Sequence, residues 1–160
     1  MANRDATKLA PLFGRDLRLD YAIHGGFYED ADLASLRSIS ASQPVRDLAL
    51  VDGIDNFTQA IANRLKTRMG ELAPLGHPDY GSRHHELIGQ PNVDRTRNLI
   101  KLYILQALRH EPRIESVLSA TVSAEHDPPR DTVRIEIQAR VIGQPVPLNL
   151  VLPFSLGAGI

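Results

Sequence analysis

Residues 133–152, VRIEIQARVIGQPVPLNLVL, decide the fold class of this 160-residue chain. Apolar side chains occupy every second position on both sides of Gly143-Gln144, and a period of two is typical of strands that bury one face. The Gly-Gln pair supplies a turn between the two strands. An earlier segment keeps the same period, with Ile114, Leu118, Ala120 and Val122 on one face. We therefore predict a three-stranded antiparallel meander in the last third of the chain.

The segment before this sheet contains an amphipathic helix. Four apolar residues recur every fourth position and form one face: Phe57, Ile61, Leu65 and Met69. Asp52 or Asp55 can cap its amino end, and Gly70 suits the left-handed residue that follows a last turn. We predict a helix over residues 54–69.

A second helix begins at Asn92 or Asp94 and continues to His110, because Pro112 pushes the residue before it out of helical geometry. Its apolar residues cover more of its circumference than one core-facing stripe requires, so it is either central in the fold or in contact with a partner. The class is α+β: two main helices packed on a small antiparallel sheet with a C-terminal three-stranded meander.

The domain organisation follows from where these patterns begin. Residues 1–45 show little periodicity and are expected to form an N-terminal arm with a short strand at Leu17–Leu19. Residues 46–160 form a single α+β domain, with a short strand at 46–51, a loop rich in Pro and Gly at 71–81 and one helical turn at 82–88.

The composition excludes several classes of protein. The net charge is -1 and the chain has no cysteine, so it shows neither the basic excess of a nucleic-acid binder nor a disulfide framework. No stretch approaches the roughly 20 apolar residues that cross a bilayer. We expect a protein that is kept in the cytoplasm until it is assembled, that binds no nucleic acid and that does not insert into a membrane.

Two catalytic readings are weak. His77, Asp79, His84 and His85 lie close in sequence, but their spacing fits no common metal site, so we expect neither a metal nor a cofactor. A peptidoglycan hydrolase would need two carboxylates across a cleft. Candidates exist in number, yet nothing in the sequence pairs any two of them: Glu71, Asp79, Glu86, Asp94, Glu111 and Glu115. No catalytic residue is assigned, and the hydrolase stays as the alternative.

Glu111-Pro112-Arg113 is a different kind of motif, because a proline separates opposite charges where a helix ends and a strand begins. Such a bend projects a carboxylate and a guanidinium from a fixed place, and arginine can bind a partner's acid groups or carbonyls with two hydrogen bonds. A local ion pair that simply stops the helix explains the same residues. The sequence leaves both readings open.

Several motifs together resemble one family, the baseplate wedge and sheath-initiator proteins of contractile phage tails, type VI secretion and extracellular contractile injection systems. They are GRDL at 14–17, DNFTQAI at 55–61, NRLKTRMGE at 63–71, YGS at 80–82, LIG at 87–89 and EPRI at 111–114. Each is weak alone, but their order and spacing hold from Leu12 to Phe154. Residues 24–43 have no counterpart in this pattern.

The resemblance implies a structural subunit and no enzyme, although some phage members carry a lysozyme label. It implies that Glu111, Pro112 and Arg113 bind wedge proteins and that the terminal strands start the sheath by pairing with its subunits. The inner tube or hub is a further expected partner, and several copies are expected in each baseplate ring of a tail-like particle. The outward residues Arg134, Gln138 and Arg140 are the expected sheath contacts, with one of them on a free edge.

Overall fold

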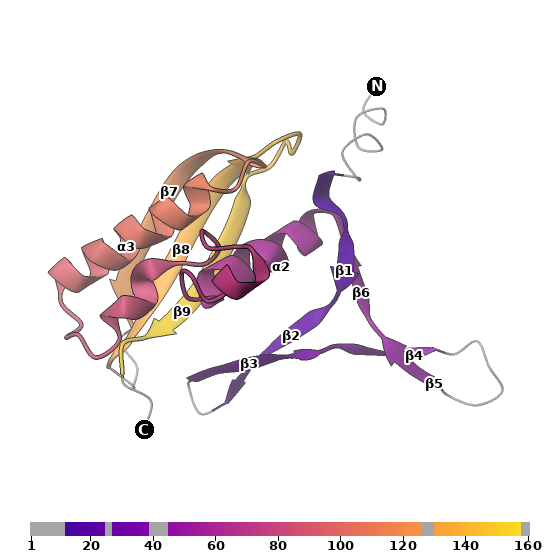
Figure 1. Ribbon diagram of the computed structural model, residues 1–160, viewed down its shortest axis with the longest axis horizontal. Helices are drawn as coiled ribbons and strands as arrows, with labels where there is room; N and C mark the ends of the chain where they lie inside the picture. Colours follow the sequence, from indigo (N-terminus) through magenta and orange to yellow (C-terminus); the bar gives the residue numbers. More distant parts are fainter. Residues whose placement is uncertain (1–11, 25–26, 39–44, 126–129, 158–160) are drawn as a thin grey trace. The chain divides into compact units, whose positions relative to one another are not determined.

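The computed structural model describes residues 12–24, 27–38, 45–125 and 130–157 (Figure 1). The chain forms two compact units, Met1–Gln59 and Ala60–Ile160. The boundary between them falls within helix α2 (Gly53–Lys66). Among the described residues, no helix is long and apolar enough to cross a membrane.

The C-terminal unit is built on a sheet of three antiparallel strands, β7 (Ile114–Ala124), β8 (Thr132–Val141) and β9 (Leu148–Ser155), in the order β7-β8-β9. Buried and exposed residues alternate along β8 from Val133 to Val141. Ala120, Ile137 and Leu150 lie opposite one another across the three strands and are buried. The meander predicted from the period of two is confirmed.

The alternation of inward and outward side chains is interrupted in β7. The pairing with β8 shifts register between Ile114 and Ser116 and again between Val117 and Ser119. Each shift changes which side chains face the core. Val117 is therefore half-buried, while Leu118 is 46% exposed. The expectation that Leu118 shares the inward face of Ile114 and Ala120 is wrong for this reason.

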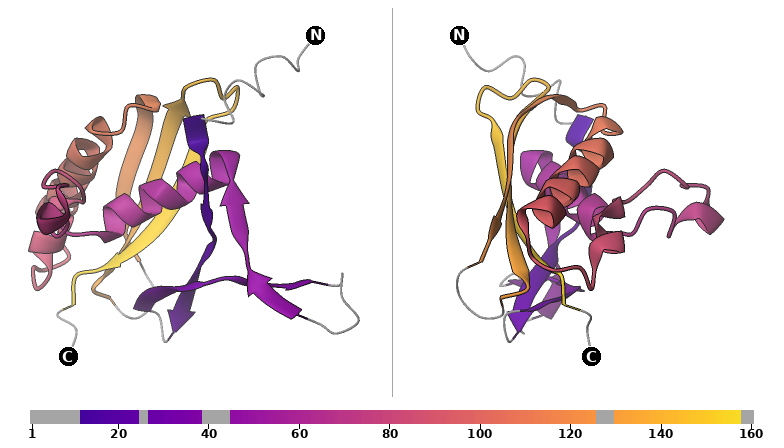
Figure 2. Two further views of the ribbon diagram at one scale, coloured as in Figure 1. Left: turned by 45° about the vertical axis from the view of Figure 1, so that its right-hand side comes forward. Right: turned by 90° about the vertical axis from the view of Figure 1, so that its left-hand side faces the viewer.

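Helix α3 (Asp94–Arg109) lies over one face of this sheet (Figure 2). It buries one stripe of side chains, Thr96, Ile100, Ile104, Ala107 and Leu108, and leaves Leu102 exposed. The residue before the helix is Val93, and no side chain caps its first turn. The helix begins at Asp94, one of the two starts that the sequence predicted. Asn92 lies before it and donates through its side-chain amide to the carbonyl of Arg130 at 3.0 Å.

Helix α2 ends at Lys66, three residues before the predicted end at Met69. The chain leaves the helix because Arg68 forms an isolated parallel bridge with Ser82. In this bridge the amide of Met69 donates to the carbonyl of Ser82 at 3.2 Å, and the amide of Ser82 donates to the carbonyl of Thr67 at 2.9 Å.

Gly81 lets the two segments of the bridge approach each other. Its φ is +106°, and a Cβ atom at this position would lie 2.5 Å from the carbonyl oxygen of Arg68. Two short 3-10 helices flank this point, η1 (Ala73–Leu75) and η2 (Arg83–Leu87). The second matches the helical turn predicted at residues 82–88, and the first was not predicted.

The N-terminal unit contains three two-stranded antiparallel ribbons. They pair β1 (Arg15–Leu17) with β6 (Leu50–Asp52), β2 (Leu19–His24) with β3 (Phe27–Leu33), and β4 (Ser35–Ser38) with β5 (Val45–Leu48). The ribbons meet at Arg18, Ala34 and Ala49, which exchange backbone hydrogen bonds of 2.8–2.9 Å in a ring. The strand predicted at Leu17–Leu19 is divided at Arg18 between β1 and β2, and the strand predicted at 46–51 is divided at Ala49 between β5 and β6. Strands β3 and β4 were not predicted. Residues 1–11, 25–26 and 39–44 of the predicted arm lie outside the described residues.

Replacing Gly81 by alanine should destabilise the protein by about 3 kcal/mol or more, because a positive φ and a clash with backbone act together. Gly89→Ala is the matched control, since its φ is +87° but nothing lies within 4 Å of the added Cβ. That control should lose only about 1–2 kcal/mol. Urea unfolding measures both, and equal losses would show that the approach to Arg68 is unimportant.

Candidate partner-binding site

The Glu111-Pro112-Arg113 bend lies between the end of α3 and the start of β7. Backbone hydrogen bonds hold it on both sides: the amide of Glu111 donates to Leu108 at 3.1 Å, and the amide of Ile114 donates to Glu111 at 3.1 Å. The carbonyl of Arg113 accepts from the amide of Ile142 at 3.0 Å. The bend is therefore anchored to the helix and to the sheet.

Glu111 and Arg113 form a two-point ion pair within the bend. Arg113 Nε lies 2.6 Å from Oε1 of Glu111, and Nη2 lies 2.9 Å from Oε2. Glu111 is only 6% exposed, whereas the side chain of Arg113 is 25% exposed and Pro112 is exposed. The local ion pair that the sequence offered as one reading is present, and a partner-binding role for these three residues stays a prediction.

The charges of the bend follow from this geometry. Burial by itself raises the pKa of the Glu111 carboxyl. Hydrogen bonds from the side chain and backbone of Arg113 lower it, and so do the positive charges of Arg113 and Arg64. The lowering effects are larger, so the pKa lies below its usual value. The hydrogen bond to Glu111 raises the pKa of Arg113. Both side chains are thus ionised at neutral pH.

Two residues from other parts of the C-terminal unit complete this site. The guanidinium carbon of Arg64, near the end of α2, lies 4.5 Å from the centre of the Tyr80 ring. Burial raises the pKa of Tyr80, and the charges of Arg64, Glu111 and Arg113 act on the same hydroxyl. We call Arg64, Tyr80, Glu111, Pro112 and Arg113 the Glu-Pro-Arg cluster. Arg64 and Tyr80 were not assigned to a site from the sequence, although both belong to the motifs of the resemblance.

The other three expected binding residues lie on β8. Arg134, Gln138 and Arg140 are exposed on the face of the sheet that is turned away from the buried one. Because β8 pairs with both β7 and β9, none of the three lies on a free edge, and that expectation is wrong. Arg134 is paired with Glu136 at 2.8 Å. Their binding of sheath subunits stays a prediction.

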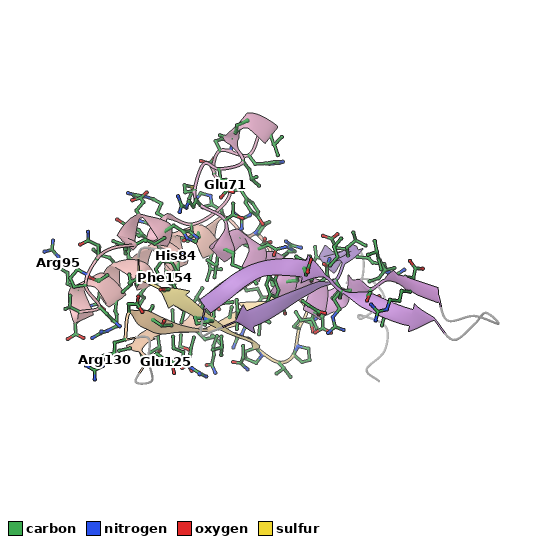
Figure 3. The ribbon with its side chains drawn as sticks, turned by 90° about the horizontal axis from the view of Figure 1, so that it is seen from below. Glu71, His84, Arg95, Glu125, Arg130 and Phe154 are labelled. Atoms are coloured by element: carbon green, nitrogen blue, oxygen red, sulfur yellow. The ribbon has the colours of Figure 1, made fainter. Side chains whose placement is uncertain are left out.

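His84 and His85 pack against Phe154, whereas His77 and Asp79 are exposed. His84 is 3% exposed, its Nδ1 lies 2.8 Å from the Ser82 hydroxyl, and its ring meets the edge of Phe154 (Figure 3). Burial, together with the neighbouring His85, lowers the pKa of His84 to about 3. His85 lies 2.9 Å from the Leu65 carbonyl through Nε2. In the described ranges, no three acidic or histidine side chains gather closely enough to hold a metal ion.

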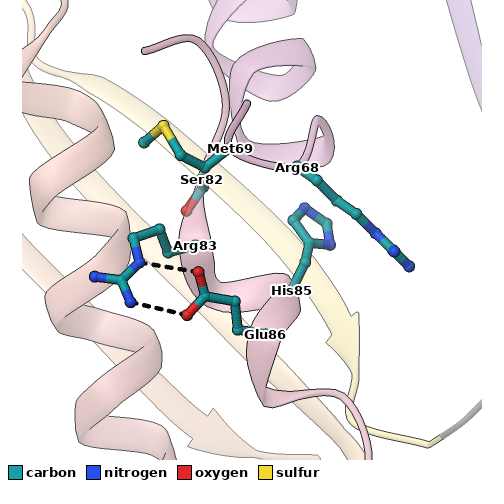
Figure 4. A pocket seen from close by; sticks show the side chains of 6 residues that line it. All are labelled: Arg68, Met69, Ser82, Arg83, His85 and Glu86. Atoms are coloured by element: carbon teal, nitrogen blue, oxygen red, sulfur yellow. Dashed lines mark hydrogen bonds and ion pairs between the residues drawn. The ribbon is translucent and has the colours of Figure 1, made fainter. Parts of the chain in front are cut away.

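One pocket of about 180 Å³ lies beside these histidines (Figure 4). It is lined by Arg68, Met69, Ser82, Arg83, His85 and Glu86. Hydrogen bonds from Arg83 lower the pKa of Glu86, and the pKa of Glu111 is lowered as well. A glycosidase needs one carboxyl whose pKa is raised, so that it can donate a proton. The pKa values of Glu86 and Glu111 are lowered instead, so neither carboxyl group is suited to donate a proton.

The family model of the baseplate wedge protein gp25 matches residues 52–146. A Geobacter sulfurreducens protein whose crystal structure carries a tail lysozyme label is 30% identical over 67% of this chain and 94% of that one, with a TM-score of 0.57. A chain of the baseplate complex from the type VI secretion system is 22% identical over 64% and 92%, with a TM-score of 0.50, and shares the fold. No curated protein matches.

Replacing Arg113 by alanine should cost about 3 kcal/mol of stability, because it leaves the buried carboxylate of Glu111 without its ion pair. The loss should be full above about pH 4.3, the ordinary pKa of a glutamate. It should shrink as the pH falls from there through the lowered pKa of Glu111 in the folded protein, where the paired carboxylate takes up a proton. Urea unfolding at pH 7 and at a series of pH values descending from 4 measures this. A loss that stays the same size over the whole series would contradict the ion-pair explanation.

Proposed function

The chain belongs to the baseplate wedge protein gp25 family of contractile injection systems, and from that premise we propose its role in assembly. It is a structural subunit that joins the baseplate wedge through the Glu-Pro-Arg cluster and starts the sheath through its C-terminal sheet. Wedge proteins and sheath subunits are its partners, with the inner tube or hub as a further one. Several copies occupy each baseplate ring, and the subunit is made in the cytoplasm before it enters the particle.

The observation that carries the wedge contact is the construction of the bend. Its backbone is fixed to α3 and β7, and the Glu111–Arg113 pair holds its side chains in one geometry. A site that is already ordered loses little conformational freedom when it binds. Pro112 is exposed and Arg113 remains partly exposed, so a partner can contact the bend without unfolding it.

The sheath contact is supported by the outer edge of β9. Pro153 has no amide hydrogen, and within a sheet proline is tolerated where its nitrogen faces away from the neighbouring strand. Backbone groups alternate in direction along a strand, so Asn149 and Val151 also turn their backbone groups away from β8. Within the described part of the chain, neither residue takes part in a backbone hydrogen bond outside the sheet. A sheath strand can pair with this edge.

The hydrolase alternative draws on the tail lysozyme label of the Geobacter protein. Against it stand the two carboxylates whose shifted pKa values lie below the usual range, each held by an arginine. We propose that this chain has no catalytic role and that Glu111 serves the structure of the bend.

The double variant Glu111→Gln/Arg113→Gln should remain folded yet bind purified wedge complex at least tenfold more weakly. It removes both charges together, so no buried charge is left unpaired. Arg83→Gln/Glu86→Gln is the matched control, because it removes another two-point arginine–glutamate pair. Pull-down with titrated wedge complex gives the affinities. Equal binding by both double variants would refute the role of the cluster.

Val151→Pro should leave the monomer folded and joined to the baseplate, yet prevent sheath growth, because it removes an amide from the free edge of β9. Leu150→Pro should instead unfold the sheet, because the same alternation turns the amide of Leu150 toward β8, and the loss is about 3 kcal/mol or more. Val151→Thr keeps the amide and should permit growth. Electron microscopy of the particles reports sheath length, and full-length sheath on Val151→Pro baseplates would exclude pairing at this edge.

A further inference from the structure

We propose that the loop of residues 71–79, which follows α2, is the apolar anchor of the wedge-binding surface, with Leu75 inserting into an apolar pocket of a wedge protein. The inference rests on the proposed docking of the Glu-Pro-Arg cluster and extends it to a second contact. The loop stands out from the body of the C-terminal unit (Figures 2 and 3).

The loop presents apolar side chains to solvent. Every residue from 73 to 79 is exposed. Leu75 is 73% exposed, more than any other large hydrophobic residue in the described part of the chain. Ala73, Pro74 and Pro78 flank it and add to the same apolar surface. A single exposed leucine is ordinary on a protein surface, so the case depends on how this one is held.

Hydrogen bonds within the loop hold Leu75 in place. The amides of Gly76 and His77 donate to the carbonyls of Ala73 at 3.0 Å and Leu72 at 3.1 Å. Gly76 has a φ of +86°, which closes the 3-10 turn η1, and two prolines restrict the unfolded chain further. An anchor that is fixed before binding avoids the entropy cost of ordering a loop at the interface.

The base of the loop joins it to the Glu-Pro-Arg cluster. The amide of Gly70 donates to the carbonyl of Tyr80 at 3.4 Å, and this closes the loop. The Tyr80 ring then lies under Arg64, and the charges of Glu111 and Arg113 act on its hydroxyl. Tyr80 thus links the base of the apolar loop to the charged bend, and an apolar anchor beside charged groups is the usual composition of a protein–protein interface.

The chemistry of the loop favours a protein pocket over a membrane. Glu71 and Asp79 stand at its two ends, and their negative charges would oppose binding to anionic lipid headgroups. One leucine between two prolines is too small an apolar surface to insert into a bilayer, but it matches a side-chain pocket on a folded partner.

The test compares Leu75→Ser with Val146→Ser in titrations with purified wedge complex. Val146 is a matched control, because it is 69% exposed in the turn between β8 and β9. Leu75→Ser should bind at least tenfold more weakly, and Val146→Ser within twofold of the wild type. Thermal unfolding checks that both remain folded. Equal binding by the two variants would overturn the proposal.

The double variant Glu111→Gln/Arg113→Gln, measured in the same titration, separates the two hypotheses. Weak binding by the double variant with normal binding by Leu75→Ser refutes the anchor and leaves the role of the bend intact. The reverse result refutes the bend and supports the anchor. If the wild type does not bind wedge complex, both are refuted. Sedimentation of the protein alone tests a further possibility, that the loop packs on a second copy of this chain. A dimer that Leu75→Ser abolishes would show this and would overturn the proposal.

Discussion

The close approach of Gly81 to the backbone of Arg68 is the constraint on which the proposed binding surface depends. Only a residue without a Cβ atom lets Ser82 pair with the segment that follows α2. This pairing closes the loop of residues 71–79. It also positions Tyr80 so that its ring packs against Arg64, and Ser82 so that its hydroxyl contacts the ring of His84. A single backbone contact therefore positions the apolar loop, one aromatic member of the cluster and part of the core.

The local ion pair and the partner contact were opposing explanations of Glu111-Pro112-Arg113, but the geometry makes them compatible. A buried carboxylate is costly unless it is paired and hydrogen-bonded, and Arg113 provides both its guanidinium and its backbone amide. Once this requirement is met, the bend has one stable shape. A fixed shape is what a subunit needs in order to join a larger assembly with a small loss of entropy.

The two units of the chain differ in how they are stabilised. The C-terminal unit buries apolar side chains from α3 and from one face of its sheet. The N-terminal ribbons are joined at a ring of three backbone hydrogen bonds, and Leu33, Leu36, Leu48 and Leu50 remain exposed on their strands. Isolated two-stranded ribbons are marginally stable in water.

The sequence by itself determined the α+β class, both helices, the three-stranded meander and the bend, because each has a local signature: a period of two or four, or a proline between charges. It could not place Leu118, since the two register shifts in β7 arise from pairing with β8. The predicted meander already places the strand of Arg134, Gln138 and Arg140 between its two neighbours, so the expectation of a free edge at these residues was inconsistent with the predicted topology. Only the tertiary structure brought Arg64 and Tyr80 to Glu111, and it did so through the backbone approach at Gly81, which acts between segments that are separate in sequence.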